Sequence, residues 1–159
     1  MKIDIICVGH LKEKYLKEAV LEYSKRLSRY VKLNIIELDD EKTPDEASLK
    51  EEEIIKAKEA QRIMKHINND AYVISLEIDG VQLDSVALSK HLNNLGVLGK
   101  SNIQFVIGGS LGIGEEVIKR ADYHLSFSKM TFPHQLMRVF LLEQIYRSFR
   151  IMKNEPYHK

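Results

Sequence analysis

The sequence predicts an α/β fold, with a mostly parallel sheet and flanking helices. Short apolar runs alternate along the chain with longer segments of helical period, which is typical of strands and helices wound around one sheet. The chain has 159 residues, of which 44% are hydrophobic, so it can bury one core but is short for two ordinary domains. We therefore expect residues 1–159 to form a single domain.

Five apolar runs predict the strands of this sheet. Each run is short, as expected of a strand buried between two layers of helices. The five strands are expected at residues 2–8, 33–38, 72–77, 103–107 and 123–127.

Three helices are predicted from the spacing of apolar residues or from the position of nearby glycines. Residues 14–30 carry apolar side chains every three to four positions, which places them on one stripe of a helix. A helix over residues 85–95 is expected to stop at Gly96, and a short helix over residues 115–120 follows a run of glycines.

The remaining long helix in the first half of the chain has a strong start signal. Thr43, Pro44 and Glu46 form a capping-box pattern with proline at the first helical position. We expect this helix to continue to about Ile67.

The last helix, from His134 to about Lys153, is the most apolar of the chain. Its wide apolar surface needs either the sheet and neighbouring helices or a second subunit to cover it. A homodimer is therefore a reasonable hypothesis. The apolar residues concerned are Leu136, Val139, Phe140, Leu142, Ile145, Phe149 and Met152.

Cysteine use and hydropathy predict a soluble cytoplasmic protein. Cys7 is the one cysteine, so it has no intramolecular disulfide partner, and its apolar neighbours indicate a packing role in a reducing compartment. Asp4 and Lys12 bound the first apolar run, so no secretory signal is expected. No segment approaches the roughly 20 apolar residues of a membrane helix.

The charges are grouped although the formal net charge is only +1. Residues 12–32 hold seven basic and three acidic residues, residues 129–159 hold six basic and two acidic, and residues 37–59 hold ten acidic and four basic. Such blocks are typical either of one basic and one acidic face or simply of solvated helices.

Four glycines lie within the stretch FVIGGSLGIG, residues 105–114. Their spacing does not fit G-x-G-x-x-G, and Glu115 stands where a phosphate-binding loop needs lysine. An ordinary dinucleotide or ATP site is therefore disfavoured. The pattern predicts a strand that ends in a side-chain-free turn, which either admits a ligand close to the backbone or is only a tight turn.

A second loop is predicted in LSFSKMTFPHQLMR, residues 125–138. Small hydroxyl residues alternate there with Phe127, Met130 and Phe132 before Pro133 ends the strand pattern. Two loops that follow strands of one sheet can form opposite walls of a pocket, so we expect a ligand site between them.

These stretches, with the opening MKIDIICVGHLK and the ending EQIYRSFRIMKNEPYHK, resemble the RlmH family of ribosomal RNA methyltransferases in the SPOUT superfamily. The resemblance runs nearly end to end. It implies transfer of a methyl group from S-adenosyl-L-methionine to N3 of a pseudouridine in 23S rRNA within the assembled ribosome. It also implies a C-terminal trefoil knot, a homodimer, no metal and no membrane association.

The resemblance also assigns roles to particular residues. Arg147, Tyr157 and His158 would form the catalytic side, with the C-terminal tail reaching across the dimer, although a free tail of this kind is expected from sequence alone to be disordered. Lys159 stands where many members have arginine, so its contact with phosphate is in doubt. The cofactor wall would consist of Leu76, Gly108, Phe127, Ser128, Lys129, Met130, Thr131 and Phe132.

Several hypotheses are possible for the catalytic step and for the function. The acceptor nitrogen must lose a proton, and either His158 or Glu143 could act as its base, whereas Arg147 could stabilise the anion without one. His134 is expected to start or pack the last helix. A non-catalytic ribosome-binding protein on the same scaffold, or an enzyme for another adenine-containing ligand, are the competing functions.

Overall fold

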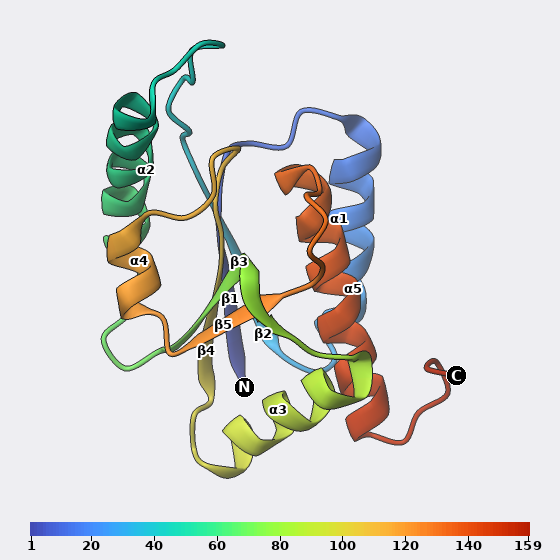
Figure 1. The fold of residues 1–159 in the computed structure, drawn as a ribbon. Helices are drawn as coiled ribbons and strands as arrows, with labels where there is room; N and C mark the ends of the chain where they lie inside the picture. The colour runs from blue at the N-terminus through green and yellow to red at the C-terminus, as the bar shows by residue number, and fades with distance from the viewer.

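The protein is a three-layered α/β structure, described for all 159 residues by a computed structural model (Figure 1). The predicted fold class is confirmed. The elements in chain order are β1 (Lys2–Val8), α1 (Lys14–Leu27), β2 (Lys32–Leu38), α2 (Leu49–Met64), β3 (Tyr72–Gln82), α3 (Ser85–Val97), β4 (Asn102–Ile107), α4 (Glu115–Arg120), β5 (Tyr123–Ser126) and α5 (His134–Met152).

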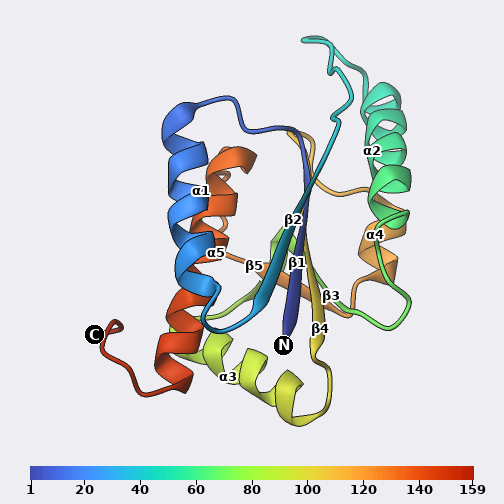
Figure 2. The ribbon, with the colours of Figure 1, turned by 180° about the vertical axis from the view of Figure 1, so that it is seen from behind.

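The five strands form one parallel sheet in the order β2-β1-β4-β3-β5. Helices α1 and α5 cover one face, with α3 beside α5, and α2 and α4 cover the other (Figures 1 and 2). None of the helices combines the length and the apolar character that crossing a lipid bilayer requires.

Side chains of β1 point alternately to the two faces of the sheet, so this strand contributes to the core on both sides. Ile3, Ile5 and Cys7 pack with α1, α3 and α5, whereas Ile6 and Val8 pack with α2 and α4. The packing role predicted for Cys7 is confirmed, since the residue is fully buried, and burial raises the pKa of its thiol to about 11.

The wide apolar surface of α5 is covered mostly by its own chain. Leu141, Leu142 and Ile145 are fully buried between the sheet, α1 and α3, and Phe149 is nearly so. Phe140 remains 37% exposed. The composition of this helix therefore does not by itself require a second subunit.

The predicted start of α2 is wrong. Thr43, Pro44 and Glu46 lie in a loop and turn, and the helix begins at Leu49 with Ser48 as its N-cap. The Ser48 side chain accepts a hydrogen bond from the backbone N–H of Glu51 at 3.2 Å. Ser48 is therefore the N-cap of α2, although the sequence around Thr43 also fits a capping pattern.

Other boundaries differ as well, since α1 ends at Leu27 rather than at residue 30 and α2 ends at Met64 rather than near Ile67. Helix α3 continues through Gly96 to Val97, and the chain turns at Gly99, which has a φ of +77°. Strand β3 extends beyond residue 77 to Gln82 because it contains a bulge, residues 77–80, before it resumes pairing with β5.

A buried arginine fixes α5 to the ends of β1 and β2. Arg138 is 1% exposed, and its Nη2 donates to the carbonyl oxygen of Gly9 at 2.6 Å while its Nη1 donates to Glu37 Oε2 at 2.5 Å. The backbone N–H of Leu11 donates to the same Glu37 oxygen at 2.9 Å. Partial burial acts to raise the pKa of Glu37, but the bonds from Leu11 and Arg138 outweigh it, so that pKa lies below its ordinary value.

We expect Arg138→Met to lower the free energy of unfolding by about 2 to 4 kcal/mol, because it removes the charged partner of Glu37 and the donor to the Gly9 carbonyl. Urea denaturation at fixed protein concentration measures this change. Arg26→Met is the matched control, since Arg26 pairs with Glu22 on the exposed surface of α1 and should shift the midpoint little. Equal midpoints for the two variants would contradict the role given to Arg138.

Candidate functional site

Two loops leave the same edge of the sheet and line one cavity. Strand β3 lies next to both β4 and β5, so the loops that follow Ile107 and Ser126 emerge side by side at the carboxyl ends of parallel strands, where ligands bind in open α/β sheets. The cavity between them has a volume of about 740 Å³. We call it the loop cavity.

The glycines of the first loop are required mainly by the folding of the chain on itself. A Cβ at Gly108 would lie 2.7 Å from the backbone carbonyl of Gly112, and a Cβ at Gly114 would lie 2.6 Å from the carbonyl oxygen of Lys56. Gly112 has a φ of +92°, which L side chains rarely adopt. The loop nevertheless presents its backbone to the cavity.

Hydroxyl groups fix the second loop. Ser126 Oγ donates to the carbonyl oxygen of Ile78 at 2.9 Å, and the backbone N–H of Met130 donates to Ser128 Oγ at 3.0 Å. The ring of Phe132 meets Phe140 edge to face at 5.8 Å between centroids. The loop is therefore held between the β3 bulge and α5.

The structure brings seven of the eight residues expected at the cofactor wall to the loop cavity. The exception is Lys129, which is exposed and does not line it. The seven are Leu76, Gly108, Phe127, Ser128, Met130, Thr131 and Phe132.

The cavity also has lining residues that sequence reasoning missed. They include two carboxylates, Glu77 and Asp79, together with Met137 and His134 from the start of α5. Half-burial, and then the neighbouring charge of Arg138, lowers the pKa of His134. A charged residue directly after Leu76, at the predicted end of a strand, is the sequence signal that could have identified Glu77.

The C-terminal tail is ordered and packs on its own α5. The Glu155 carboxylate pairs with Arg150 and accepts a hydrogen bond from Tyr30 Oη at 2.6 Å, and Arg150 Nη2 donates to the carbonyl oxygen of Pro156 at 2.8 Å. The ring of Tyr157 meets Tyr146 at 4.9 Å. The sequence-based expectation of a disordered end is wrong for this chain.

This packing gathers Arg147, Tyr157 and His158 around Glu143, and we call the four the tail cluster. Arg147 Nη2 donates to Glu143 Oε1 at 2.5 Å, and Tyr157 Oη donates to the same oxygen at 3.0 Å. The guanidinium carbon of Arg147 lies 4.7 Å from the centroid of the Tyr157 ring. Burial, followed by the bond to Glu143, raises the pKa of Tyr157 to about 12.

Arg147 also determines which ring nitrogen of His158 carries the proton. Its Nη1 lies 3.2 Å from His158 Nδ1, and because a guanidinium only donates hydrogen bonds, that ring nitrogen must be the acceptor. His158 then carries its proton on Nε2. The remaining Glu143 oxygen accepts from Gln144 Nε2 at 2.7 Å, so both candidate bases are already bonded to donors.

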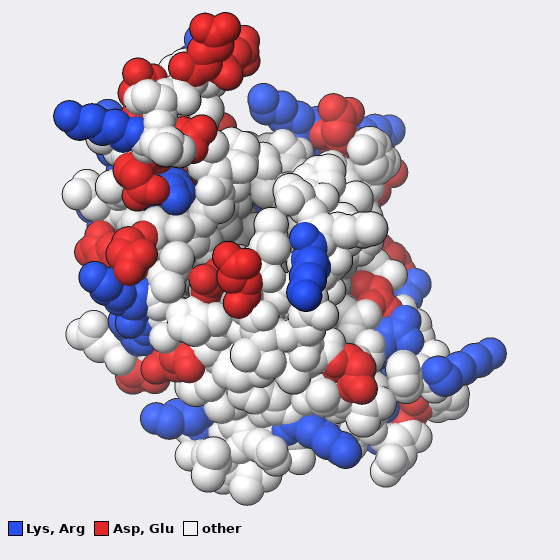
Figure 3. Space-filling model, in the orientation of Figure 1, with Lys and Arg blue, Asp and Glu red and all other residues white.

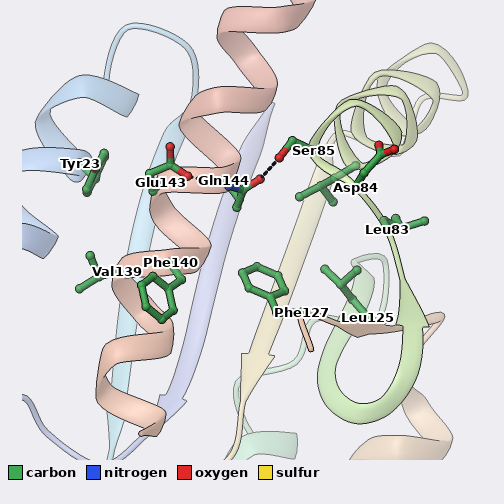
Figure 4. Close-up of a pocket in the computed structure, with 11 residues that line it drawn as sticks. Tyr23, Leu83, Asp84, Ser85, Leu125, Phe127, Val139, Phe140, Glu143 and Gln144 are labelled. Atoms are coloured by element: carbon green, nitrogen blue, oxygen red, sulfur yellow. Dashed lines mark hydrogen bonds between the residues drawn. The ribbon is translucent and has the colours of Figure 1, made fainter. Parts of the chain in front are cut away.

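A second cavity, of about 600 Å³, is lined by residues from α1, α3, β5 and α5, among them Glu143 of the tail cluster (Figure 4). We call it the helix cavity. Figure 4 shows Phe127 beside α5 and across from Phe140, with Glu143 on the same helix and Gln144 bonded to Ser85 at 2.8 Å. Phe127 and Leu125 line both cavities. Arg147, Tyr157 and His158 line neither.

Acidic side chains gather over α2 and the connection that precedes it, at the upper left of Figure 3. The basic stretches are partly neutralised by ion pairs within their own helices, such as Lys14 with Glu18 and Arg147 with Glu143. The surface therefore carries no extended basic field on the face that Figure 3 shows.

Comparisons with known proteins agree along the whole chain. A family model described as a predicted SPOUT methyltransferase matches residues 1–158. A Clostridium kluyveri protein named ribosomal RNA large subunit methyltransferase H is 67% identical over 159 residues, which is 100% of both chains. Proteins of the same name from Clostridium perfringens and Clostridium beijerinckii are 65% and 62% identical over the same full length.

Proposed function

Because the chain belongs to the SPOUT methyltransferase family, and within it to the RlmH group, we propose that it transfers a methyl group from S-adenosyl-L-methionine to N3 of a pseudouridine in 23S rRNA. The observation that carries this proposal is the loop cavity, whose walls are the two strand-end loops. The sequence resemblance assigns these same loops to the methyl donor. The knot that the resemblance implies stays a prediction.

The loop cavity suits such a donor. Its volume of about 740 Å³ lies within the range of roughly 300 to 1,000 Å³ found for small-molecule sites. Leu76, Phe127 and Phe132 supply apolar walls for a flat ring, and the backbone near Gly108 supplies hydrogen-bonding groups. When bound there, S-adenosyl-L-methionine would supply an electrophilic methyl group on a sulfonium sulfur.

We propose that Arg147 activates the acceptor. The acceptor nitrogen of a uracil-type ring is an imide N–H, which must give up its proton, here to solvent water, as the new N–C bond forms. A guanidinium that Glu143 holds in place can donate hydrogen bonds to the anion, which lowers the cost of forming it without taking the proton itself. The bonds already made by Glu143 and His158 favour this role over general base catalysis by either.

We further propose a homodimer in which the tail cluster of one copy serves the loop cavity of the other. Met137 lines the loop cavity, and Arg147 lies ten residues further along α5, or about 15 Å along the helix axis. Productive methyl transfer needs reacting atoms within about 3.5 Å. The tail cluster of the same chain is thus badly placed for a ring at its own loop cavity.

The substrate is proposed to be the assembled ribosome in the cytoplasm. With a net charge of +1 and basic stretches that are partly paired, the chain is expected to bind naked RNA weakly, since such affinity comes largely from phosphate contacts. Specificity would then depend on the folded ribosomal surface.

Calorimetry with S-adenosyl-L-methionine and S-adenosyl-L-homocysteine tests the proposed function. We expect both to bind competitively at one site, and Gly108→Ala to weaken both by about tenfold or more, because its Cβ would strike the Gly112 backbone. Gly96→Ala is the matched control, since its Cβ would meet only the flexible Met1 side chain at 3.3 Å. Absence of binding by the unmodified protein, with binding to ribosomes retained, would favour the non-catalytic ribosome-binding function instead.

Steady-state methylation of ribosomes tests the tail cluster. We expect Arg147→Ala to lower kcat by about 10²- to 10³-fold, as for loss of an anion-stabilising donor, and His158→Ala to lower it less. Both should leave the affinity for S-adenosyl-L-homocysteine nearly intact. Arg26→Ala removes a comparable pair within α1 and should have no effect. Unchanged turnover in Arg147→Ala would remove this residue from the site.

Mixing experiments test the shared site. Gly108→Ala and Arg147→Ala, each nearly inactive alone, should regain roughly a quarter of the unmodified activity after joint refolding at equal amounts, because half of the statistical dimers hold one intact site. Sedimentation should give a dimer at micromolar concentration. A stable monomer, or no recovery on mixing, would contradict the proposal.

A further inference from the structure

Glu77 lies on the wall of the loop cavity where β3 departs from regular pairing with β5. Leu76 and Val81 both pair with Leu125, so residues 77–80 form a bulge between them. Glu77 shares one face of the strand with Ser75, which donates a hydrogen bond to it, and bulges are common next to functional sites.

The bulge is held rigidly against β5. A Cβ at Gly80 would lie 2.8 Å from the backbone carbonyl of His124, so only glycine allows this close approach. Ser126 Oγ donates to the carbonyl oxygen of Ile78 at 2.9 Å. The backbone that carries Glu77 is therefore fixed on both sides.

The two oxygens of the Glu77 carboxylate have different surroundings. Oε2 accepts hydrogen bonds from Ser75 Oγ and from His124 Nδ1, the latter at 2.5 Å. Oε1 makes no hydrogen bond within the protein, and the side chain is 17% exposed. One oxygen is thus anchored, and the other is available to whatever occupies the cavity.

Building on the proposed function, we propose that Glu77 Oε1 accepts hydrogen bonds from the ribose hydroxyls of the methyl donor. A carboxylate only accepts hydrogen bonds, so its ligand must offer a hydroxyl, an ammonium group or an amino group such as that of adenine, and the deoxy ligands below separate the ribose from the adenine. Ser75 and His124 are positioning residues that hold the acceptor in one orientation.

Burial favours the ribose over the amino-acid end of the ligand. An ammonium group brought against this largely covered carboxylate would lose the hydration of a full charge, whereas a hydroxyl loses far less. Asp79, which also lines the cavity but is exposed, offers a charged end a better hydrated place.

Calorimetry with S-adenosyl-L-homocysteine and 5′-methylthioadenosine tests this role, because the second ligand keeps the ribose but lacks the amino-acid end. We expect Glu77→Gln to weaken both ligands by roughly tenfold or more, as for loss of a hydrogen bond to a charged group. His124→Gln should weaken both by a smaller factor. Asp79→Asn, the matched control in the same wall, should leave the affinity for 5′-methylthioadenosine within about twofold of the unmodified value.

A second arm begins with the unmodified protein. The 2′-deoxy and 3′-deoxy forms of 5′-methylthioadenosine should bind the unmodified protein more weakly than the parent compound, and this difference should shrink in Glu77→Gln. Unchanged affinity for both deoxy forms would overturn the proposal, as would a loss in Glu77→Gln confined to S-adenosyl-L-homocysteine, which would place the ammonium there. If the unmodified protein bound neither parent ligand, the proposed function itself would fail.

Discussion

The buried guanidinium of Arg138 sets the position of α5 relative to the sheet, and both cavities depend on that position. A charge that is 1% exposed is tolerated only when its hydrogen bonds are made inside the protein. The two Nη atoms of Arg138 make them to Glu37, at the end of β2, and to the carbonyl oxygens of Val8 and Gly9, at the end of β1, and only its Nε has no partner. Since α5 lines the loop cavity and the helix cavity, this one side chain places those walls relative to the strand-end loops.

The strands were predictable because strands buried on both faces read as continuous apolar runs. Their order was not, because it depends on pairings such as that of Ile5 with Phe105, a hundred positions apart. The start of α2 was misplaced because capping is a local signal, and two segments satisfied it. Only the segment that begins at Ser48 leads directly into the turns that pack on the sheet, with Ile55 as the first buried residue.

The sequence predicted the loop cavity but left two reasons open for its glycines, a close ligand or a tight turn. A parallel sheet puts both loops at one edge, but their meeting also depends on β4 and β5 lying on either side of β3, which the fold class alone does not determine. The contacts of Gly108 and Gly114 are with the protein's own backbone, which composition could not reveal. Lys129 falls outside the wall because neighbouring side chains in an extended loop point in different directions. Glu77 directly follows Leu76, but its hydrogen bonds to Ser75 and to His124 depend on the pairing of β3 with β5, which no local pattern indicated.

Helix α5 borders the two cavities with its first part and holds the C-terminal tail with its last turns, which is why the tail is ordered. Its first turn borders the loop cavity, its middle borders the helix cavity, and its last turns hold the tail through Arg150 and Glu155. A free tail would lose conformational entropy on each encounter with substrate. Docked on α5, the tail already holds Tyr157 against Glu143 and Arg147 of that helix. Because Tyr157, whose pKa is raised to about 12, keeps its proton at neutral pH and Glu143 is paired with Arg147, the cluster offers a set of N–H and O–H donors rather than a free base, which suits stabilising an anion better than removing a proton.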